Sequence, residues 1–86
     1  MTCKIEHLTA VGVVVLRVSG HIQSEHVGMI EQLIARADSQ VELDLTEITL
    51  ADRDAVSFLA LWELRGIVLR NCPPFLREWV TNEQAS

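Results

Sequence analysis

The middle of the chain runs from a short apolar strand through a polar turn directly into a helix. Residues 41–45 read Val-Glu-Leu-Asp-Leu, which suits a strand. Asp52 is suited to cap a helix over about residues 53–65, and Gly66 is suited to end it. Because strands that alternate with helices are typical of α/β folds, this junction points to that class.

The rest of the sequence continues the alternation. Gly12 lies in a tight connection between two strands, Ser24 can cap a helix, and Pro74 can open the last one. The expected strands are residues 3–8, 13–19, 41–45 and 67–69, and the expected helices are residues 25–37, 53–65 and 74–80. The predicted fold is therefore a small mixed β-sheet of about four strands, with two main helices and a short C-terminal helix on the sheet.

Composition favours one small domain. The chain has 86 residues, of which 49% are hydrophobic, and no apolar run approaches the roughly 20 residues of a membrane span. We expect a single domain over residues 1–80 and a frayed polar tail over residues 81–86. The N-terminus lacks the charged start and apolar stretch of an export signal, so a cytoplasmic location is expected.

The net charge of −5 bears on the choice of partner. Only 7 residues are Lys or Arg, and they are spread along the chain. Nucleic-acid binding depends on clustered basic residues that neutralise phosphates, so this balance argues against it. We expect a protein or small-molecule partner and no direct insertion into a membrane.

The strand and turn in the middle of the chain resemble the signature of the STAS domain, the anti-sigma factor antagonist fold. In that family a strand reading roughly V-x-L-D-L-S leads to a D-S-[ST]-G-[LV] turn, whose second hydroxyl residue is phosphorylated. Here the turn reads Asp52-Arg53-Asp54-Ala55-Val56, so the acid is kept while both hydroxyls and the glycine are replaced. Residues 15–20 are also similar to an early V-L-x-L-x-G strand of the family, and residues 68–80 extend the resemblance toward the C-terminus.

The resemblance implies a non-catalytic regulatory domain of bacterial-type signalling, which binds an anti-sigma factor or a related histidine-kinase-like ATPase. An alternative within the family is an accessory subunit of an ABC lipid-transport complex that braces the nucleotide-binding subunit. In STAS domains the turn and the helix after it form the partner surface. The residues assigned to that surface are Asp52, Arg53, Asp54, Ser57, Leu61 and Leu64.

Each of these assignments has an alternative. Asp54 stands at the phosphoacceptor-equivalent position, where it could act as a fixed negative charge or only as favourable helix-start chemistry. Asp52 is expected chiefly to cap backbone N–H groups, with partner contact as the other possibility. Leu61 and Leu64 fall among polar neighbours on the helix, so they either contact a partner or are covered by the final helix.

Signals for catalysis are weak. The histidines His7, His21 and His26 lack metal-binding spacing, and we expect them to be solvated. Cys3 and Cys72 have no CxxC spacing and are read as reduced, and Cys72 as inert packing. The glycines stand alone, so no phosphate loop is present. Phe75 and Trp79 are expected to be core residues. The sequence therefore predicts no enzyme activity, cofactor or metal.

Overall fold

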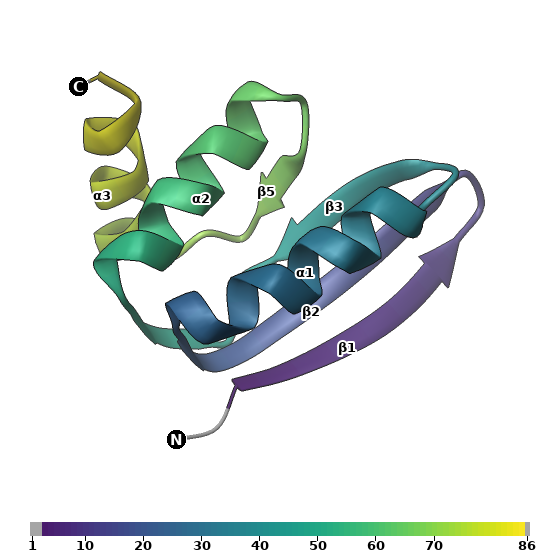
Figure 1. Ribbon diagram of the computed structural model, residues 1–86, viewed down its shortest axis with the longest axis horizontal. Coiled ribbons are helices and arrows are strands. Elements are labelled where there is room, and N and C mark those ends of the chain that lie inside the picture. The colour runs from purple at the N-terminus through teal and green to yellow at the C-terminus, as the bar shows by residue number, and fades with distance from the viewer. Residues whose placement is uncertain (1–2, 86) are drawn as a thin grey trace.

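The computed structural model describes residues 3–85 as a small α/β fold with a mixed five-stranded sheet and three helices (Figure 1). The strands are β1 (Cys3–Ala10), β2 (Val13–Ile22), β3 (Gln40–Asp44), β4 (Ile48–Ala51) and β5 (Val68–Arg70). The helices are α1 (Ser24–Arg36), α2 (Arg53–Leu64) and α3 (Pro74–Ala85). The predicted α/β class is confirmed.

Strand β2 organises the sheet. One edge of β2 pairs antiparallel with β1, through a tight turn at Val11 and Gly12, where Gly12 takes a φ of 75° that suits glycine. The other edge pairs in parallel first with β3 and then, from Gly20 to Ile22, with β4. The register of the pairing with β4 shifts between Gly20 and His21. Strand β5 adds to the far side of β3, also in parallel.

The core lies on the face of the sheet that α1 covers (Figure 1). Register places Leu16, Leu43 and Leu69 side by side on this face, because β3 pairs with β2 and β5 pairs with β3 at those positions. Leu16 and Leu43 are fully buried. All three helices contribute to the same apolar cluster, through Val27 and Ile30 of α1, Val56 and Leu59 of α2, and Leu76 and Val80 of α3.

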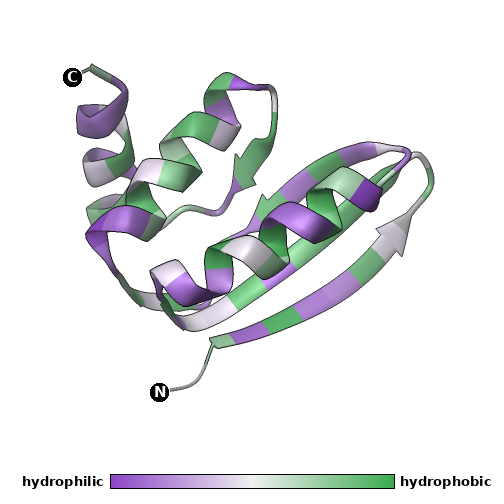
Figure 2. Cartoon of the chain, in the orientation of Figure 1, coloured by the Kyte–Doolittle hydropathy of each residue, from purple (hydrophilic) through white to green (hydrophobic). Residues whose placement is uncertain are grey.

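The alternate residues of the strands form the opposite face. On this face β3 carries Glu42 and Asp44, and β1 carries Lys4 and Glu6. Hydrophilic residues are accordingly seen along both strands (Figure 2). Leu8 and Val68 belong to this face and are 40% and 42% exposed. The sheet therefore presents one face to the helices and one to solvent.

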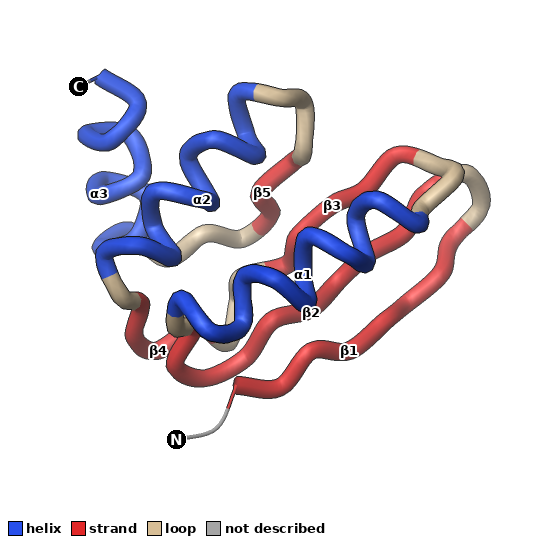
Figure 3. The backbone as a smooth tube through the Cα atoms, in the orientation of Figure 1, coloured by secondary structure: helices blue, strands red, loops and turns tan. Residues whose placement is uncertain are grey.

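The sheet differs from the prediction by one strand. Strand β4 occupies residues expected to form a turn, and it continues the sheet below β3 (Figure 3). Its burial does not alternate, since Ile48 and Ala51 are buried while Thr49 and Leu50 are exposed. Strand β2 also continues past Gly20, which was expected to end it, and Gly20 takes a φ of 87° where β2 changes from β3 to β4.

The C-terminal helix was also underestimated. Helix α3 has 12 residues, as many as α2, and it includes all of the expected tail up to Ala85; Ser86 lies outside the described residues. It packs mainly against α2 rather than on the sheet. Phe75, expected in the core, is 47% exposed, whereas Trp79 packs against the core as expected. The cap of α1 is Gln23 and not Ser24, which is already helical.

Candidate functional site

The start of α2 is the first part of the candidate site. Asp52 has the extended backbone of an N-cap residue, and its carbonyl oxygen accepts the first helical hydrogen bond, from the N–H of Val56 at 3.0 Å. Its carboxylate makes no capping hydrogen bond. Instead, Oδ1 of Asp52 lies 2.7 Å from Nε2 of His21. The expectation that the Asp52 side chain caps the helix is therefore wrong, because β2 and β4 bring a histidine within its reach.

His21 was expected to be solvated, and its side chain is only 12% exposed. Its Nδ1 is buried and has no hydrogen-bond partner among the described residues. His26 is also engaged, since its Nδ1 accepts the backbone N–H of Gln23 at 3.0 Å. Only His7 is exposed. The pair of His21 and Asp52 therefore fixes the end of β2 to the start of α2.

Four of the six residues predicted for partner binding share one side of α2. Asp54, Ser57, Leu61 and Leu64 are spaced by three, four and three residues, which places them on one face of a helix, and all four are exposed. We call these four residues the α2 stripe. The opposite side of α2 is buried through Ala55, Val56, Leu59, Ala60 and Trp62. Arg53 is exposed beside the stripe.

The two leucines of the α2 stripe are not covered by α3. Leu61 is 39% exposed and Leu64 is 69% exposed. They border a shallow groove of about 240 Å³, whose lining residues are Ser57, Ala60, Leu61, Leu64, Glu83 and Gln84. Of the two alternatives for these leucines, cover by the final helix is excluded, and their apolar surface is accessible to another molecule.

Helix α3 forms the other wall of this groove. The Ser57 hydroxyl donates to Oε1 of Glu83 at 2.7 Å, and the Gln84 amide donates to the Ala60 carbonyl at 3.3 Å. Sequence reasoning missed Glu83 and Gln84 because they were assigned to a frayed tail. The spacing of Leu76, Val80 and Gln84 is a signal that could have extended the helix.

A second set of contacts ties α3 to α2 farther along both helices. Arg77 donates to both carboxylate oxygens of Glu63, at 2.9 and 2.8 Å, and Gln84 donates to Oε1 of Glu63 at 2.7 Å. The hydrogen bond from Arg77 holds the pKa of Glu63 below its ordinary value, although partial burial opposes this. A bidentate pair of this kind fixes geometry as well as charge, so it sets the position of α3 beside the groove.

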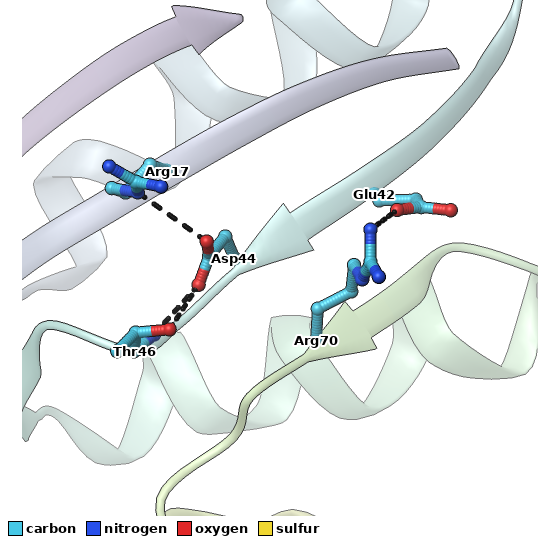
Figure 4. A network of polar contacts seen from close by, with 5 residues as sticks. All are labelled: Arg17, Glu42, Asp44, Thr46 and Arg70. Atoms are coloured by element: carbon cyan, nitrogen blue, oxygen red, sulfur yellow. Dashed lines mark hydrogen bonds and ion pairs between the residues drawn. The ribbon is translucent and has the colours of Figure 1, made fainter. Parts of the chain in front are cut away.

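The strand that leads toward the turn is held by a network on the solvent face of the sheet (Figure 4). Asp44 ends β3 and accepts hydrogen bonds from the backbone N–H of Thr46 at 3.0 Å, from the Thr46 hydroxyl, and from Nε of Arg17 at 3.4 Å. Beside it, Arg70 donates to Glu42 at 2.9 Å. Asp44 is only 8% exposed. Burial acts to raise the pKa of Asp44, but hydrogen bonds from Thr46, Asn71 and Arg17 together outweigh it and lower that pKa.

These shifts predict a loss of stability in acid. Because the folded pKa values of Asp44 and Glu63 are lowered, their contributions are present above the unfolded values of about 4 and are lost as pH falls through the folded values. Asp44→Asn should lower the free energy of unfolding by about 1–3 kcal/mol at pH 7. In urea titrations the free energy of unfolding of Asp44→Asn should differ less from that of the wild type at pH 3 than at pH 7. Asp38→Asn, at an exposed position, should unfold with nearly the wild-type free energy at both pH values. An equal Asp44→Asn deficit at both pH values would contradict this assignment.

Neither thiol is activated. Cys3 and Cys72 are free, and burial raises the pKa of both, with Arg77 partly opposing the effect at Cys72. Among residues 3–85, no group of three or more His, Cys, Asp and Glu side chains is placed to hold a metal ion. The helices of this part of the chain are too short or too polar to cross a membrane.

The arrangement at α2 is thus an exposed apolar and acidic surface bounded by polar groups of α3. No protein-family model matches the chain, and no curated protein matches it. The resemblance to STAS domains rests on the motifs of the strand, the turn and the C-terminal segment.

Proposed function

We propose that the chain is a non-catalytic, STAS-like regulatory domain of the cytoplasm that binds a protein partner through the turn at residues 52–55 and the α2 stripe. The observation that carries this proposal is the exposure of Leu61 and Leu64 on the same side of α2 as Asp54. Apolar residues rimmed by polar ones are typical of protein contact sites. The class of partner in this proposal comes from the resemblance of the preceding strand and turn to the STAS signature.

The partner in this proposal is an anti-sigma factor or a related histidine-kinase-like ATPase. The groove beside the α2 stripe combines two leucines with the half-buried carboxylate of Glu83, and Asp54 adds an exposed carboxylate. Such a surface is complementary to an apolar side chain flanked by Lys or Arg on the partner. The test is capture from the native source with the intact protein as bait, followed by identification of the bound ATPase. Recovery of the nucleotide-binding subunit of an ABC transporter would instead favour the accessory-subunit function.

The substitutions in the turn predict that it is not a serine-kinase site. Arg53 and Asp54 replace both hydroxyl residues, so incubation with the captured ATPase and ATP should leave the mass of the turn peptide unchanged. Intact mass followed by peptide mapping measures this. Ser57, Thr46 and Thr49 carry exposed hydroxyls outside the turn. A phosphate on one of them would contradict the loss of the switch and show that the phosphorylation site has moved.

A further inference from the structure

The outer edge of β1 is a second surface of the molecule, remote from α2. Strand β1 ends the sheet, and within residues 3–85 it pairs with β2 alone. The Ala10 and Val13 pair flanks the two-residue turn and is therefore doubly hydrogen-bonded. Because hydrogen-bonded pairs alternate along antiparallel strands, Leu8, Glu6 and Lys4 also bond to β2. The backbone N–H and C=O groups of Thr9, His7, Ile5 and Cys3 consequently point to the free edge.

The helix layer does not close over this edge. Helix α1 lies over β2 and β3, while β1 runs alongside it at a distance (Figure 1). A hollow of about 450 Å³ lies between α1 and β1, lined by His7, Val14, Leu33, Arg36, Ala37, Asp38 and Ser39. Met29 falls on the same side of α1 as Leu33 and Arg36 and is 55% exposed. On β1, the half-buried side chains of Cys3 and Ile5 pack against the core.

The charges on β1 favour one register for pairing with a second copy of β1. Charged residues on an edge strand usually oppose pairing with another strand. When β1 pairs antiparallel with a second β1, a two-fold axis at Lys4 or Glu6 sets like charges opposite each other, which is unfavourable. Of the possible axes at residues 4–8, only Ile5 sets each Lys4 opposite the Glu6 of the other copy. These two positions form non-hydrogen-bonded pairs, in which side chains are closest.

We propose that the partner of this edge is a second copy of the chain, whose β1 pairs antiparallel across a two-fold axis at Ile5. The outward backbone groups of Cys3, Ile5 and His7 then bond to His7, Ile5 and Cys3 of the other copy. Because the axis is perpendicular to the sheet, both helix layers stay on the same face and the two sheets become continuous. The α2 stripe is left free, so the dimer does not depend on the proposed function.

Disulfide trapping tests the register. In a Cys3→Ser, Cys72→Ser background, Ile5→Cys should cross-link to itself under mild oxidation, because paired Cα atoms lie about 5.5 Å apart, within the range for a disulfide. His7→Cys in the same background is the matched control and should not, since the two copies of that position lie about 14 Å apart along the strands. With native Cys3 restored, His7→Cys should cross-link. Cross-linking of the control but not of Ile5→Cys would overturn the register.

Charge exchange tests the same pairing without cysteines. Lys4→Glu faces Glu6 of the other copy and should weaken the dimer at least about tenfold by sedimentation equilibrium, with an unchanged circular dichroism spectrum. Lys4 faces the uncharged Ser19 on β2, so Lys4→Glu places no like charge opposite it within the hairpin. The double variant Lys4→Glu, Glu6→Lys restores opposite charges between the copies and should recover dimerisation. Because Glu6 faces Arg17 on β2, this variant is compared only if its circular dichroism spectrum matches that of the wild type. A monomeric wild type at millimolar concentration, or a double variant weaker than Lys4→Glu, would refute the proposal.

Discussion

Replacing Leu64 with Asp is expected to weaken capture of the partner at least about 100-fold while leaving the fold intact. Leu64 is the more exposed of the two leucines in the α2 stripe, at 69%, so a charge there costs little in the free protein. In the complex the same charge would be transferred into an apolar contact without a counter-ion, which is strongly unfavourable. A loss of that size corresponds to about 2.7 kcal/mol of binding free energy. Leu61→Asp should act in the same direction.

The control is Val11→Asp, in the exposed turn between β1 and β2, which should bind like wild type. Affinity is measured by titration calorimetry with the captured partner, and folding by circular dichroism and melting temperature. Leu61 is less exposed, at 39%, so its variant can lose stability for reasons unrelated to binding, and Leu64 carries the test. Wild-type affinity of Leu64→Asp would remove the α2 stripe from the interface.

The sequence predicts elements whose pattern is local. The helix expected over residues 53–65 has a cap position before it, a broad apolar side and a glycine after it, and α2 begins and ends within a residue of that expectation. The predicted stripe on its other side is exposed as well. Strand β4 has no such pattern, because its pairing with β2 sets its burial: Thr49 and Leu50 are exposed in succession. A four-residue strand without alternation cannot be separated from a turn by sequence alone.

Contacts between residues far apart in the sequence were also missed, because no local pattern predicts them. His21 and Asp52 are 31 positions apart, and they meet only because β4, which was not predicted, runs beside the end of β2. Once they meet, the Asp52 carboxylate binds the imidazole rather than the N–H groups of α2. The wall of the groove formed by Glu83 and Gln84 depends likewise on the packing of α3 against α2. Local propensity predicted the exposed stripe of α2 but not the side chains of α3 that line the groove beside it.

Asp54 is expected to set the affinity for the partner without contributing much to stability. It lies in the first turn of α2, is exposed, and makes no hydrogen bond or ion pair with the described residues. A carboxylate there gains about 0.3–1 kcal/mol from the helix dipole. Asp54→Asn removes the charge at constant size, Asp54→Ala removes the charge and the hydrogen-bonding group, and Asp54→Ser restores the hydroxyl of the STAS signature. All three should lower the free energy of unfolding by about 1 kcal/mol or less.

The affinity of these three variants distinguishes a fixed switch from helix-start chemistry. If the carboxylate holds the domain in one binding state, Asp54→Asn and Asp54→Ala should shift the dissociation constant by more than about tenfold, or 1.4 kcal/mol, in the same direction. Glu25→Gln is the matched control, because Glu25 is an exposed acid in the first turn of α1 and shares the dipole effect alone. Its affinity should not change. Both residues lie in the first turn of a helix, so a change in affinity seen for the Asp54 variants alone must come from contact with the partner. Unchanged affinity in all the Asp54 variants would show that Asp54 only stabilises the start of α2.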